Sequence, residues 1–420
     1  MFSRLIDAKI KKMIHTFRCL SLCGARQVGK SFYLRQFSLE ENGIYQTMDD
    51  PLVRKEAEDD PIGWIRRHRK PGFPLIIDEA VKCPDLFNAV KIIVDEEDPV
   101  PTKIVLASSS NYLLLRQIKE SLAGRVGLLN LYPLSWLEVA GREKTLLSLL
   151  LDPEKICHEE KSFSVTDLNR ERTKLLLHGG FPEIQTKLDW EFTSQWSSQY
   201  FSTYILPLAV ELFRVAKQNS FEQVFRQLCL RSSQLTNFSA IANSTDVSSV
   251  TVKNHVHYLE AMMVCRTLNQ FHRNRIKRLV KSPKIHLMDP LFVNWNFNSP
   301  RDLGLLKRAG IDGALYESWI VSEITKSVEY ESLNFELTTW HTQDKAEVDL
   351  IISTGIWSIP LEIKFKPKIT RRDLSGLKSW MESHNHESPI GYIVYTGSKL
   401  EKLDHNIWAI PDYYLLGIAE

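Results

Sequence analysis

The sequence has no strong excess of one charge, no long hydrophobic run and no paired cysteine motif. Its 53 Lys and Arg nearly balance its 51 Asp and Glu, so a uniformly basic surface is excluded and any contact with nucleic acid needs a local patch. The longest uncharged run of the amino-terminal part, Ile104 to Leu115, has 12 residues, whereas a membrane-spanning helix needs about 20. We therefore expect no contact with a membrane.

The 6 cysteines are spread along the chain without a CxxC pair, which argues against both a zinc site and a disulfide scaffold. Residues 1–17 interrupt their apolar side chains with charges every few positions. This segment is therefore predicted to be a first helix and not a signal peptide. Together these absences favour a protein of the reducing cytoplasm.

The 420 residues are enough for several domains at roughly 150 residues each. Residues 1–140 alternate short apolar runs with helical patterns, as a parallel α/β sheet requires, and residues 141–230 have the helical pattern of a lid or connector. Residues 231–300 hold two short helical patterns and a basic segment, and residues 301–420 turn to an α+β pattern. The strands expected in the first part are Cys19–Cys23, Ile44–Met48, Leu75–Ile77 and Lys103–Ala107.

The strongest signal is a complete GxxxxGK[ST] motif that follows an apolar strand and opens a helical run. Its glycines let backbone N–H groups wrap phosphates, the ammonium of Lys30 neutralises the β- and γ-phosphates, and the hydroxyl of Ser31 ligates Mg²⁺. A plain glycine turn is the alternative. The motif predicts an ATP and Mg²⁺ site formed by Gly24, Ala25, Arg26, Gln27, Val28, Gly29, Lys30 and Ser31.

Two carboxylates end the apolar strand that lies about 50 residues after this loop. Asp78 at the strand's carboxyl end is expected to hold the Mg²⁺ ion through water, and Glu79 to polarise the water that attacks the γ-phosphate. Taken alone, an apolar strand ending in Asp-Glu is equally a solvated strand end. Together with Lys30, the pair predicts ATP hydrolysis.

Two further segments carry side chains suited to a triphosphate. Ser108, Ser109, Ser110 and Asn111 follow a strand and offer hydroxyl and amide groups to a γ-phosphate or its water, although a strand cap or turn is the alternative. Arg125 follows a glycine at an expected helix end. It is either an arginine that stabilises charge on a nucleotide, in its own or a neighbouring subunit, or a surface arginine.

Several stretches along the chain carry a resemblance to a known family: GARQVGKS, MDDPLVRKEAEDDP, LIIDEAVKCPDLFNAVK, ASSSNYLLL, ESLAGRVGLLNLYPLSWLE and GGFPE. On these residues the chain resembles the prokaryotic AAA-fold ATPases that carry a carboxy-terminal domain of unknown function. The resemblance covers almost the full length, with Ala107-Ser108 standing where the family usually has Thr-Gly, which puts a sensor role for this strand in doubt. It implies an AAA-type P-loop ATPase that often assembles into homo-oligomers, followed by a domain similar to PD-(D/E)xK nucleases.

The middle of the chain predicts two helices joined by a short turn, over 235–242 and 247–259, with Ser248 or Ser249 as the N-cap of the second. In a winged helix-turn-helix the second helix enters a groove, and Lys253, Asn254 and His257 would face it. A helix pair that packs between domains is the alternative.

A basic segment follows, with no acidic residue between Ala261 and Met288. Such a stripe neutralises phosphates and predicts contact with DNA or RNA, although charge runs are also ordinary solvated faces. Its cations are Arg266, Arg273, Arg275, Lys277, Arg278, Lys281 and Lys284.

The last part predicts an αβββαβ order, that of restriction-endonuclease-like folds. Asp349 on one strand and Glu362 with Lys364 on the next match D-x(n)-ExK, and period-two alternation puts the last two on one face. Such carboxylates can hold a second Mg²⁺, with Lys364 orienting its water and Glu317 as a further ligand. An ordinary half-exposed antiparallel strand has the same pattern.

These features predict a cytoplasmic ATPase whose hydrolysis of MgATP controls nucleic-acid contact or cleavage by the last domain. A nucleotide-dependent switch, whose rear domains bind protein or DNA without catalysis, is the alternative. The two differ in whether any nucleic acid is cut.

Overall fold

The computed structural model describes residues 2–96, 103–143, 147–152, 164–215, 217–272, 282–342 and 346–418. It divides into two compact units. The amino-terminal unit comprises Arg4–Pro133 with Ala261–Met263, and the carboxy-terminal unit comprises Met1–Ser3, Leu134–Glu260 and Val264–Glu420. The first compact unit thus ends at Pro133, a few residues before the domain boundary expected near residue 140, which stays a prediction.

The amino-terminal unit is built on a five-stranded sheet in the order β2-β3-β4-β1-β5, and every pair in it is parallel. The four predicted strands are confirmed, and a fifth, which the sequence analysis missed, pairs along the whole of β1. All carboxyl ends therefore lie at one edge of the sheet. The strands are β1 (Cys19–Gly24), β2 (Ile44–Thr47), β3 (Leu75–Asp78), β4 (Ile104–Ala107) and β5 (Val126–Leu131).

Helices cover this sheet because their apolar positions recur at helical spacing. The fully buried Trp64 and Phe87 belong to a core with Leu106 of β4. Asp50 and Asp60 cap two successive helices, each followed by a proline at the first helical position. The helices are α1 (Ile6–Met13), α2 (Lys30–Glu40), α3 (Pro51–Asp59), α4 (Pro61–His68), α5 (Asp85–Glu96) and α6 (Asn111–Ser121).

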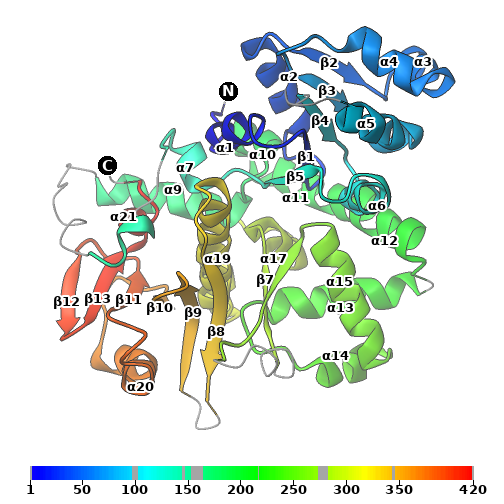
Figure 1. Ribbon diagram of the computed structural model, residues 1–420. Helices are drawn as coiled ribbons and strands as arrows, with labels where there is room; N and C mark the ends of the chain where they lie inside the picture. The colour runs from blue at the N-terminus through cyan, green and yellow to red at the C-terminus, as the bar shows by residue number, and fades with distance from the viewer. Residues whose placement is uncertain are drawn as a thin grey trace. The chain divides into compact units, whose positions relative to one another are not determined.

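The carboxy-terminal unit begins with helices, as the pattern of 141–230 predicted (Figure 1). Ser135 forms a capping box with Glu138 at the first of them. Trp196 and Tyr200 stack at 4.9 Å, and Phe181 packs against both in a tilted arrangement at 4.9 and 5.2 Å, which forms an aromatic core. The elements are α7 (Trp136–Val139), η2 (Leu147–Leu149), α9 (Val165–His178), α10 (Pro182–Lys187), α11 (Trp190–Tyr200), the π-helix η3 (Phe201–Ile205), α12 (Leu206–Phe213) and α13 (Gln218–Leu230).

The two expected middle helices are present and a short antiparallel ribbon follows them. Ser248 accepts the N–H of Thr251 at 3.0 Å and so caps the second helix. Leu235, ahead of the first helix, forms an isolated antiparallel bridge to Lys284 in the ribbon. The elements are α14 (Phe238–Thr245), α15 (Ser249–Ala261), β6 (Cys265–Leu268), β7 (Lys284–Leu287), α17 (Pro290–Asn296) and α18 (Leu303–Arg308).

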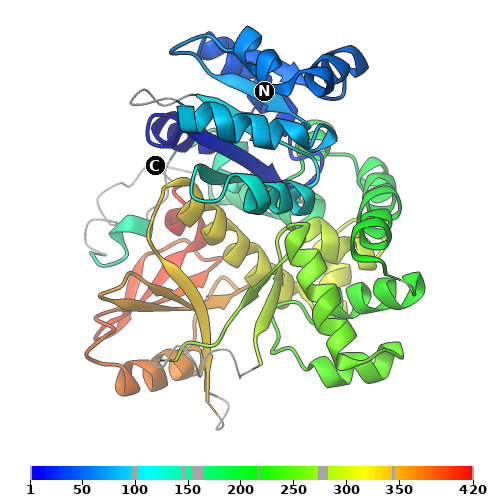
Figure 2. The ribbon, with the colours of Figure 1, turned by 45° about the vertical axis from the view of Figure 1, so that its right-hand side comes forward.

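The end of the chain forms a six-stranded mixed sheet in the order β12-β13-β11-β10-β9-β8. The predicted αβββαβ order is confirmed, and two strands that the sequence analysis did not expect extend it. Helices α19 and α20 lie on opposite sides of this sheet (Figures 1 and 2). The elements are α19 (Asp312–Tyr330), β8 (Glu336–His341), β9 (Glu347–Ser353), β10 (Ser358–Lys364), η4 (Arg371–Leu374), α20 (Ser375–Ser383), β11 (Gly391–Tyr395), β12 (Glu401–Asp404), β13 (Ile407–Pro411) and α21 (Asp412–Leu415).

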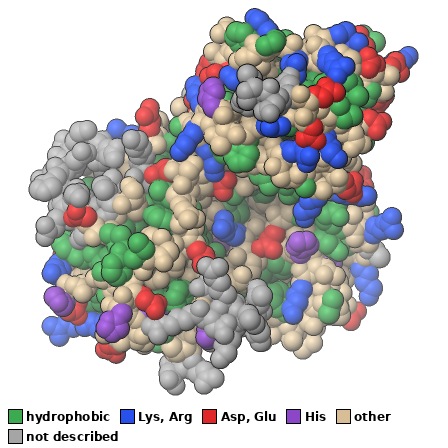
Figure 3. All heavy atoms as spheres, in the orientation of Figure 1, with side chains coloured by type: hydrophobic (Ala, Val, Ile, Leu, Met, Phe, Trp, Pro, Cys, Tyr) green, Lys and Arg blue, Asp and Glu red, His purple; other side chains and the backbone are tan. Residues whose placement is uncertain are grey.

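The described surface and cysteines agree with the composition. Acidic and basic side chains are interspersed over the face shown in Figure 3, as expected for a nearly balanced charge. The described cysteines, Cys19, Cys23, Cys83, Cys229 and Cys265, are all buried free thiols. Among the described residues, no helix is both long and apolar enough to cross a membrane.

Candidate functional site: a nucleotide pocket and a buried carboxylate cluster

The GxxxxGK[ST] segment forms the turn between β1 and α2, where the sheet's carboxyl edge meets a helix N-terminus. Gly24 must be glycine because a Cβ there would lie 2.5 Å from the carbonyl oxygen of Leu131 on β5. Gly29 has φ of 94°, a left-handed conformation that side chains disfavour. The chain therefore folds into a loop whose backbone N–H groups can surround an anion.

Lys30 begins α2 and is only 7% exposed. Its Nζ donates to the carbonyl oxygens of Gly24 and Ala25 at 2.7 and 2.8 Å, so the loop itself holds the ammonium in place. Burial lowers the pKa of Lys30 to about 8, although the carboxylates of Glu79 and Asp78 act in the opposite direction. A buried cation therefore stands at the loop without a carboxylate directly bonded to it.

Asp78 ends β3, and β4 separates this strand from β1 in the sheet. Its Oδ2 accepts the hydroxyl of Tyr45 at 2.6 Å and its Oδ1 accepts the N–H of Glu79 at 3.0 Å. Burial and the neighbouring Asp78 raise the pKa of Tyr45 to about 12, so its hydroxyl stays protonated and donates. The sequence analysis missed Tyr45, which lies 33 positions away.

Glu79 follows in a left-handed conformation, with φ of 51°. Its carboxylate accepts the hydroxyl of Ser108 at 3.2 Å, and the N–H and hydroxyl of Ser109 at 2.9 and 3.0 Å. Since β4 lies between β3 and β1, the serines after β4 stand between the two predicted carboxylates and the loop. The structure thus brings Glu79 and these serines together, with the serines positioning the carboxylate.

Two side chains anchor the loop from outside the motif. Arg4 donates to the carbonyl oxygens of Val28 and Tyr132 at 2.8 and 2.6 Å. Asn111 accepts the buried N–H of Gly24 at 2.7 Å. The carbonyl oxygen of Asn111 therefore holds the loop, while its buried Nδ2 has no hydrogen-bond partner within the described residues, and its contact with a γ-phosphate stays a prediction.

A cavity of about 330 Å³ opens on this edge of the sheet. Asp49 and Lys82, which the sequence analysis missed, form an ion pair of 2.6 Å at its wall. The predicted residues Arg26, Gln27, Gly29, Lys30, Ser31 and Glu79 line it, together with Phe32, Asp49, Lys82 and Ser109. One cavity therefore contains most of the predicted phosphate-binding side chains.

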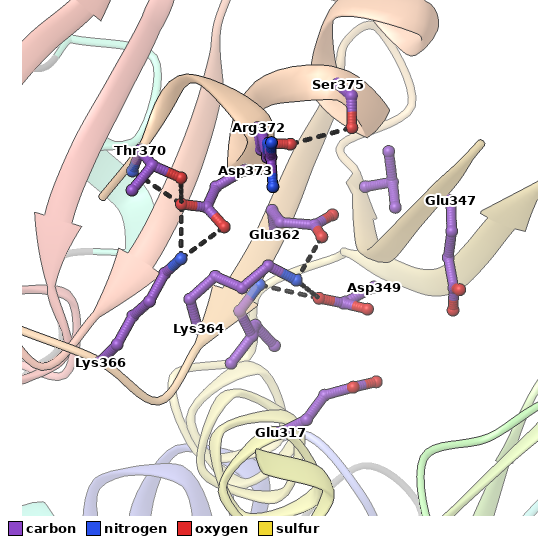
Figure 4. A network of polar contacts seen from close by, with 12 residues as sticks. Glu317, Glu347, Asp349, Glu362, Lys364, Lys366, Thr370, Arg372, Asp373 and Ser375 are labelled. Carbon is purple, nitrogen blue, oxygen red and sulfur yellow. Dashed lines mark hydrogen bonds and ion pairs between the residues drawn. The ribbon is translucent and has the colours of Figure 1, made fainter. Parts of the chain in front are cut away.

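In the carboxy-terminal unit, carboxylates from three elements lie close together: Glu317 from α19, Glu347 and Asp349 from β9, and Glu362 from β10 (Figure 4). Lys364 donates to Glu362 at 2.5 Å and lies 3.8 Å from Asp349. The same oxygen of Asp349, Oδ2, accepts the N–H of Ile363 at 2.8 Å.

A residue predicted for nucleic acid completes this cluster. Lys284 of β7 is 1% exposed, and its Nζ lies 3.0 Å from Glu317, 3.1 Å from Asp349 and 2.5 Å from Glu347. Its assignment to a solvent-facing basic stripe is therefore wrong, because the ammonium is buried among carboxylates. Arg266 lies on β6, and the remaining cations of that segment, at 273–281, lie outside the described residues.

Burial and the close charges shift the pKa values in this cluster. Burial, with the charge of Asp349, raises the pKa of both Glu317 and Glu362 to about 8. Burial also disfavours the charged forms of Asp349 and Lys284, but the ammonium groups of Lys284 and Lys364 hold the pKa of Asp349 below its ordinary value. The carboxylates raise the pKa of Lys284 well above its own. Asp349 and Lys284 are therefore a buried ion pair at neutral pH.

The second middle helix exposes the residues predicted to face a groove. Lys253, Asn254 and His257 are exposed, whereas Val252 and Leu259 on the other side of α15 are fully buried. Lys253 also lies over the ring of Phe238 on α14, at 5.4 Å. The α15 helix therefore exposes the three predicted residues and buries its opposite side, while its role as a recognition helix stays a prediction.

A second cavity, of about 850 Å³, lies beside these helices. Arg214 and Lys217, from the connection between α12 and α13, line it with Asn254 of α15. Within the described part of the chain, neither cation has an ion-pair partner, and Asp246 is the only acidic residue of the lining. The cavity is thus open to an anion.

Three family models match separate parts of the chain. Residues 16–140 match an AAA domain, and this match coincides with the parallel sheet and its loop. The amino-terminal unit contains an AAA-type P-loop domain. Residues 169–300 and 312–415 of the carboxy-terminal unit match two different domains of unknown function.

The chain is 24% identical, over 412 residues, to uncharacterized proteins of Mycobacterium tuberculosis and Mycobacterium bovis, a match that covers 96% of this chain and 82% of each relative. Among solved structures it is similar to the Walker-type ATPase PABY2304 of Pyrococcus abyssi, at 16% identity and a TM-score of 0.45, covering 71% of this chain and 96% of that one. A signal transduction ATPase with numerous domains from Pyrococcus horikoshii gives 12% identity and a TM-score of 0.28, covering 79% and 48%.

Arg125 of the AAA domain lies after Gly124, as expected, and outside the residues that line the nucleotide cavity. Its guanidinium makes a bidentate pair with Asp95 of α5, at 2.6 and 2.9 Å. The pair is partly exposed, at 35% for Arg125 and 41% for Asp95, so solvent weakens it, but its two hydrogen bonds orient the guanidinium toward α5. A role toward a nucleotide would require the pair to break.

Proposed function

We propose that the AAA domain binds and hydrolyses MgATP, and that the nucleotide controls contact of the carboxy-terminal unit with nucleic acid. One observation carries the first part. Lys30, Ser31 and Glu79 line a single cavity, and Asp78 ends the strand beside it. An ammonium, a hydroxyl and two carboxylates at one sheet edge are the groups that triphosphate chemistry needs.

The side chains of the cavity fit a triphosphate and its metal ion. The loop carbonyls that now accept from Lys30 are weaker acceptors than phosphate oxygens, so Lys30 would turn its N–H groups to the β- and γ-phosphates. Ser31 and Asp78 would hold Mg²⁺, which when bound neutralises charge that develops on the phosphates. Ser108 and Ser109 hold the carboxylate of Glu79 in place, and this carboxylate would accept the proton of the attacking water.

Two variants test this assignment. Lys30→Ala is expected to abolish ATP binding measured by calorimetry, and Glu79→Gln to keep binding but lower the turnover number by about 10²- to 10⁴-fold, the usual contribution of a general base. Lys119→Ala, an exposed lysine on α6, is the control and should behave as the wild type. Undiminished hydrolysis by Glu79→Gln would remove the role of that carboxylate.

The second part of the proposal rests on α14 and α15. A helix-turn-helix followed by an antiparallel ribbon is the element order of a winged helix, and α15 exposes Lys253, Asn254 and His257. The unpaired cations Arg214 and Lys217 add positive charge at the cavity beside α15. We therefore propose α15 as the helix that contacts nucleic acid.

Binding and ATPase assays with duplex DNA, single-stranded DNA and RNA, each at two salt concentrations, test this part. One of them is expected to bind, more weakly at high salt, and to change the ATPase rate. The double variant Lys253→Ala/Asn254→Ala should lose both the binding and the change in ATPase rate. Lys307 is an exposed lysine on α18, and Lys307→Ala should keep both. If the protein binds none of the three nucleic acids, the proposed role of α15 is refuted.

The second candidate is a narrower form of the switch considered from the sequence, one that binds ATP without hydrolysing it, and it is favoured by the three hydrogen bonds that hold Glu79 to Ser108 and Ser109. In a switch, this carboxylate would stay with the serines after ATP binds, and turnover would be negligible. Single-turnover measurements with ATP decide between the two. Rapid formation of ADP in one turnover favours the ATPase, and tight ATP binding without ADP favours the switch.

A further inference from the structure

The buried cluster of the carboxy-terminal unit contains its own cation. Lys284 belongs to β7, and its Nζ lies within 3.1 Å of carboxylate oxygens from Glu317, Glu347 and Asp349. Those carboxylates come from α19 and β9, two elements that follow β7 in the chain. The ammonium of Lys284 therefore lies between these carboxylates, at the place where a metal ion bound by them would lie.

The residues predicted for a second Mg²⁺ do not fit one in this arrangement. A divalent ion needs several carboxylate oxygens at about 2.0 to 2.6 Å. One oxygen of Asp349 accepts from Lys284 and the other from the N–H of Ile363, while Glu362 accepts from Lys364. Within the described ranges, no three or more His, Cys, Asp or Glu side chains are arranged to hold a metal ion.

The backbone holds Lys284 at this place. In the β6–β7 ribbon, Lys284 pairs with Leu268, and it also forms the bridge to Leu235. This pairing fixes the Cα of Lys284, and because the side chain is only 1% exposed, the groups packed around it would have to move for the side chain to leave. Removing a buried ammonium from its carboxylates would also leave uncompensated charge on both sides, which is strongly unfavourable.

We infer that Lys284 is the resident cation of the carboxylate cluster and that it excludes a divalent ion from Glu317 and Asp349. The cluster then joins the β6–β7 ribbon to α19 and the mixed sheet, and it does not serve metal-dependent cleavage. This inference is independent of ATP hydrolysis, since every residue it uses lies in the carboxy-terminal unit.

Binding of Mn²⁺ to the nucleotide-free full-length protein, followed by electron paramagnetic resonance, tests the inference. The wild type and Asp349→Asn are expected to give the same titration, since no ion binds at this cluster. Lys284→Met should gain one Mn²⁺ site, and the double variant Lys284→Met/Asp349→Asn should lose it again. Lys326→Met is the matched control: it removes another buried lysine, bonded to the single carboxylate of Glu323, and should gain no site.

Two results would overturn the inference. The first is a Mn²⁺ ion that the wild type binds and Asp349→Asn loses. The second is a folded Lys284→Met variant that gains no site. If Lys284→Met does not fold, the comparison of the wild type with Asp349→Asn decides alone, because a shared titration supports the resident lysine and a lost ion contradicts it.

Discussion

The buried ammonium of Lys30 gives a prediction about pH. Burial lowers its pKa to about 8 in the free protein, so above this pH an increasing fraction of the lysine is neutral. Bound phosphates need the cation and would hold the proton on it. ATP binding is therefore expected to take up a proton above pH 8, and the ATP affinity should fall as the pH rises.

The size of this effect follows from the pKa. With a free-state pKa of about 8, roughly one lysine in eleven is charged at pH 9, which weakens ATP binding about tenfold, or about 1.4 kcal/mol. At pH 7 the loss is negligible. Calorimetric titration with MgATP between pH 7 and pH 9.5, in buffers of different ionisation enthalpy, would measure both the affinity and the proton uptake.

Lys30→Arg provides the matched control, because a guanidinium stays charged throughout this range. Its ATP affinity is expected to be lower than that of the wild type, since the side chain is larger, but independent of pH. A wild-type affinity that is constant from pH 7 to pH 9.5, or an equal pH dependence in Lys30→Arg, would refute the reasoning.

Three further perturbations have definite outcomes. The guanidinium of Arg172 is 4% exposed and donates to Asp412 at 2.6 Å. Asp412→Ala would leave this buried charge without its carboxylate, so the free energy of unfolding in urea should fall by about 3 to 5 kcal/mol. Asn111→Ala removes the acceptor of the buried Gly24 N–H and should weaken ATP binding, an effect of about 1 to 3 kcal/mol that fluorescence titration would detect. Arg125→Ala should leave the urea unfolding midpoint nearly unchanged, because solvent screens its pair with Asp95, and should lower the ATPase rate only where ultracentrifugation shows assembly. An ATPase rate that falls equally in the monomer would instead place Arg125 at its own nucleotide.

Local sequence was sufficient for the loop and for most of the strands. Gly24 to Ser31 are consecutive, and their glycines, lysine and hydroxyl are fixed by the turn between one strand and one helix. The αβββαβ order of the last part followed from period-two and helical patterns, which record burial within each element. The strand Val126–Leu131 was missed because its sequence, VGLLNL, contains a glycine and an asparagine, which disfavour strands, and because the apolar Leu128 is 47% exposed, so its polarity does not follow its burial.

Only the tertiary structure decided which side chains meet. Asn111 reaches the loop from 87 positions away, Arg4 reaches Tyr132 across 128, and Lys284 reaches Asp349 across 65. In the sequence Lys284 ends a basic run, and nothing local distinguishes it from a solvated cation. Its burial among carboxylates depends on how β7, α19 and β9 pack together, because a charge is stable in the interior only where distant parts of the chain bring its partners.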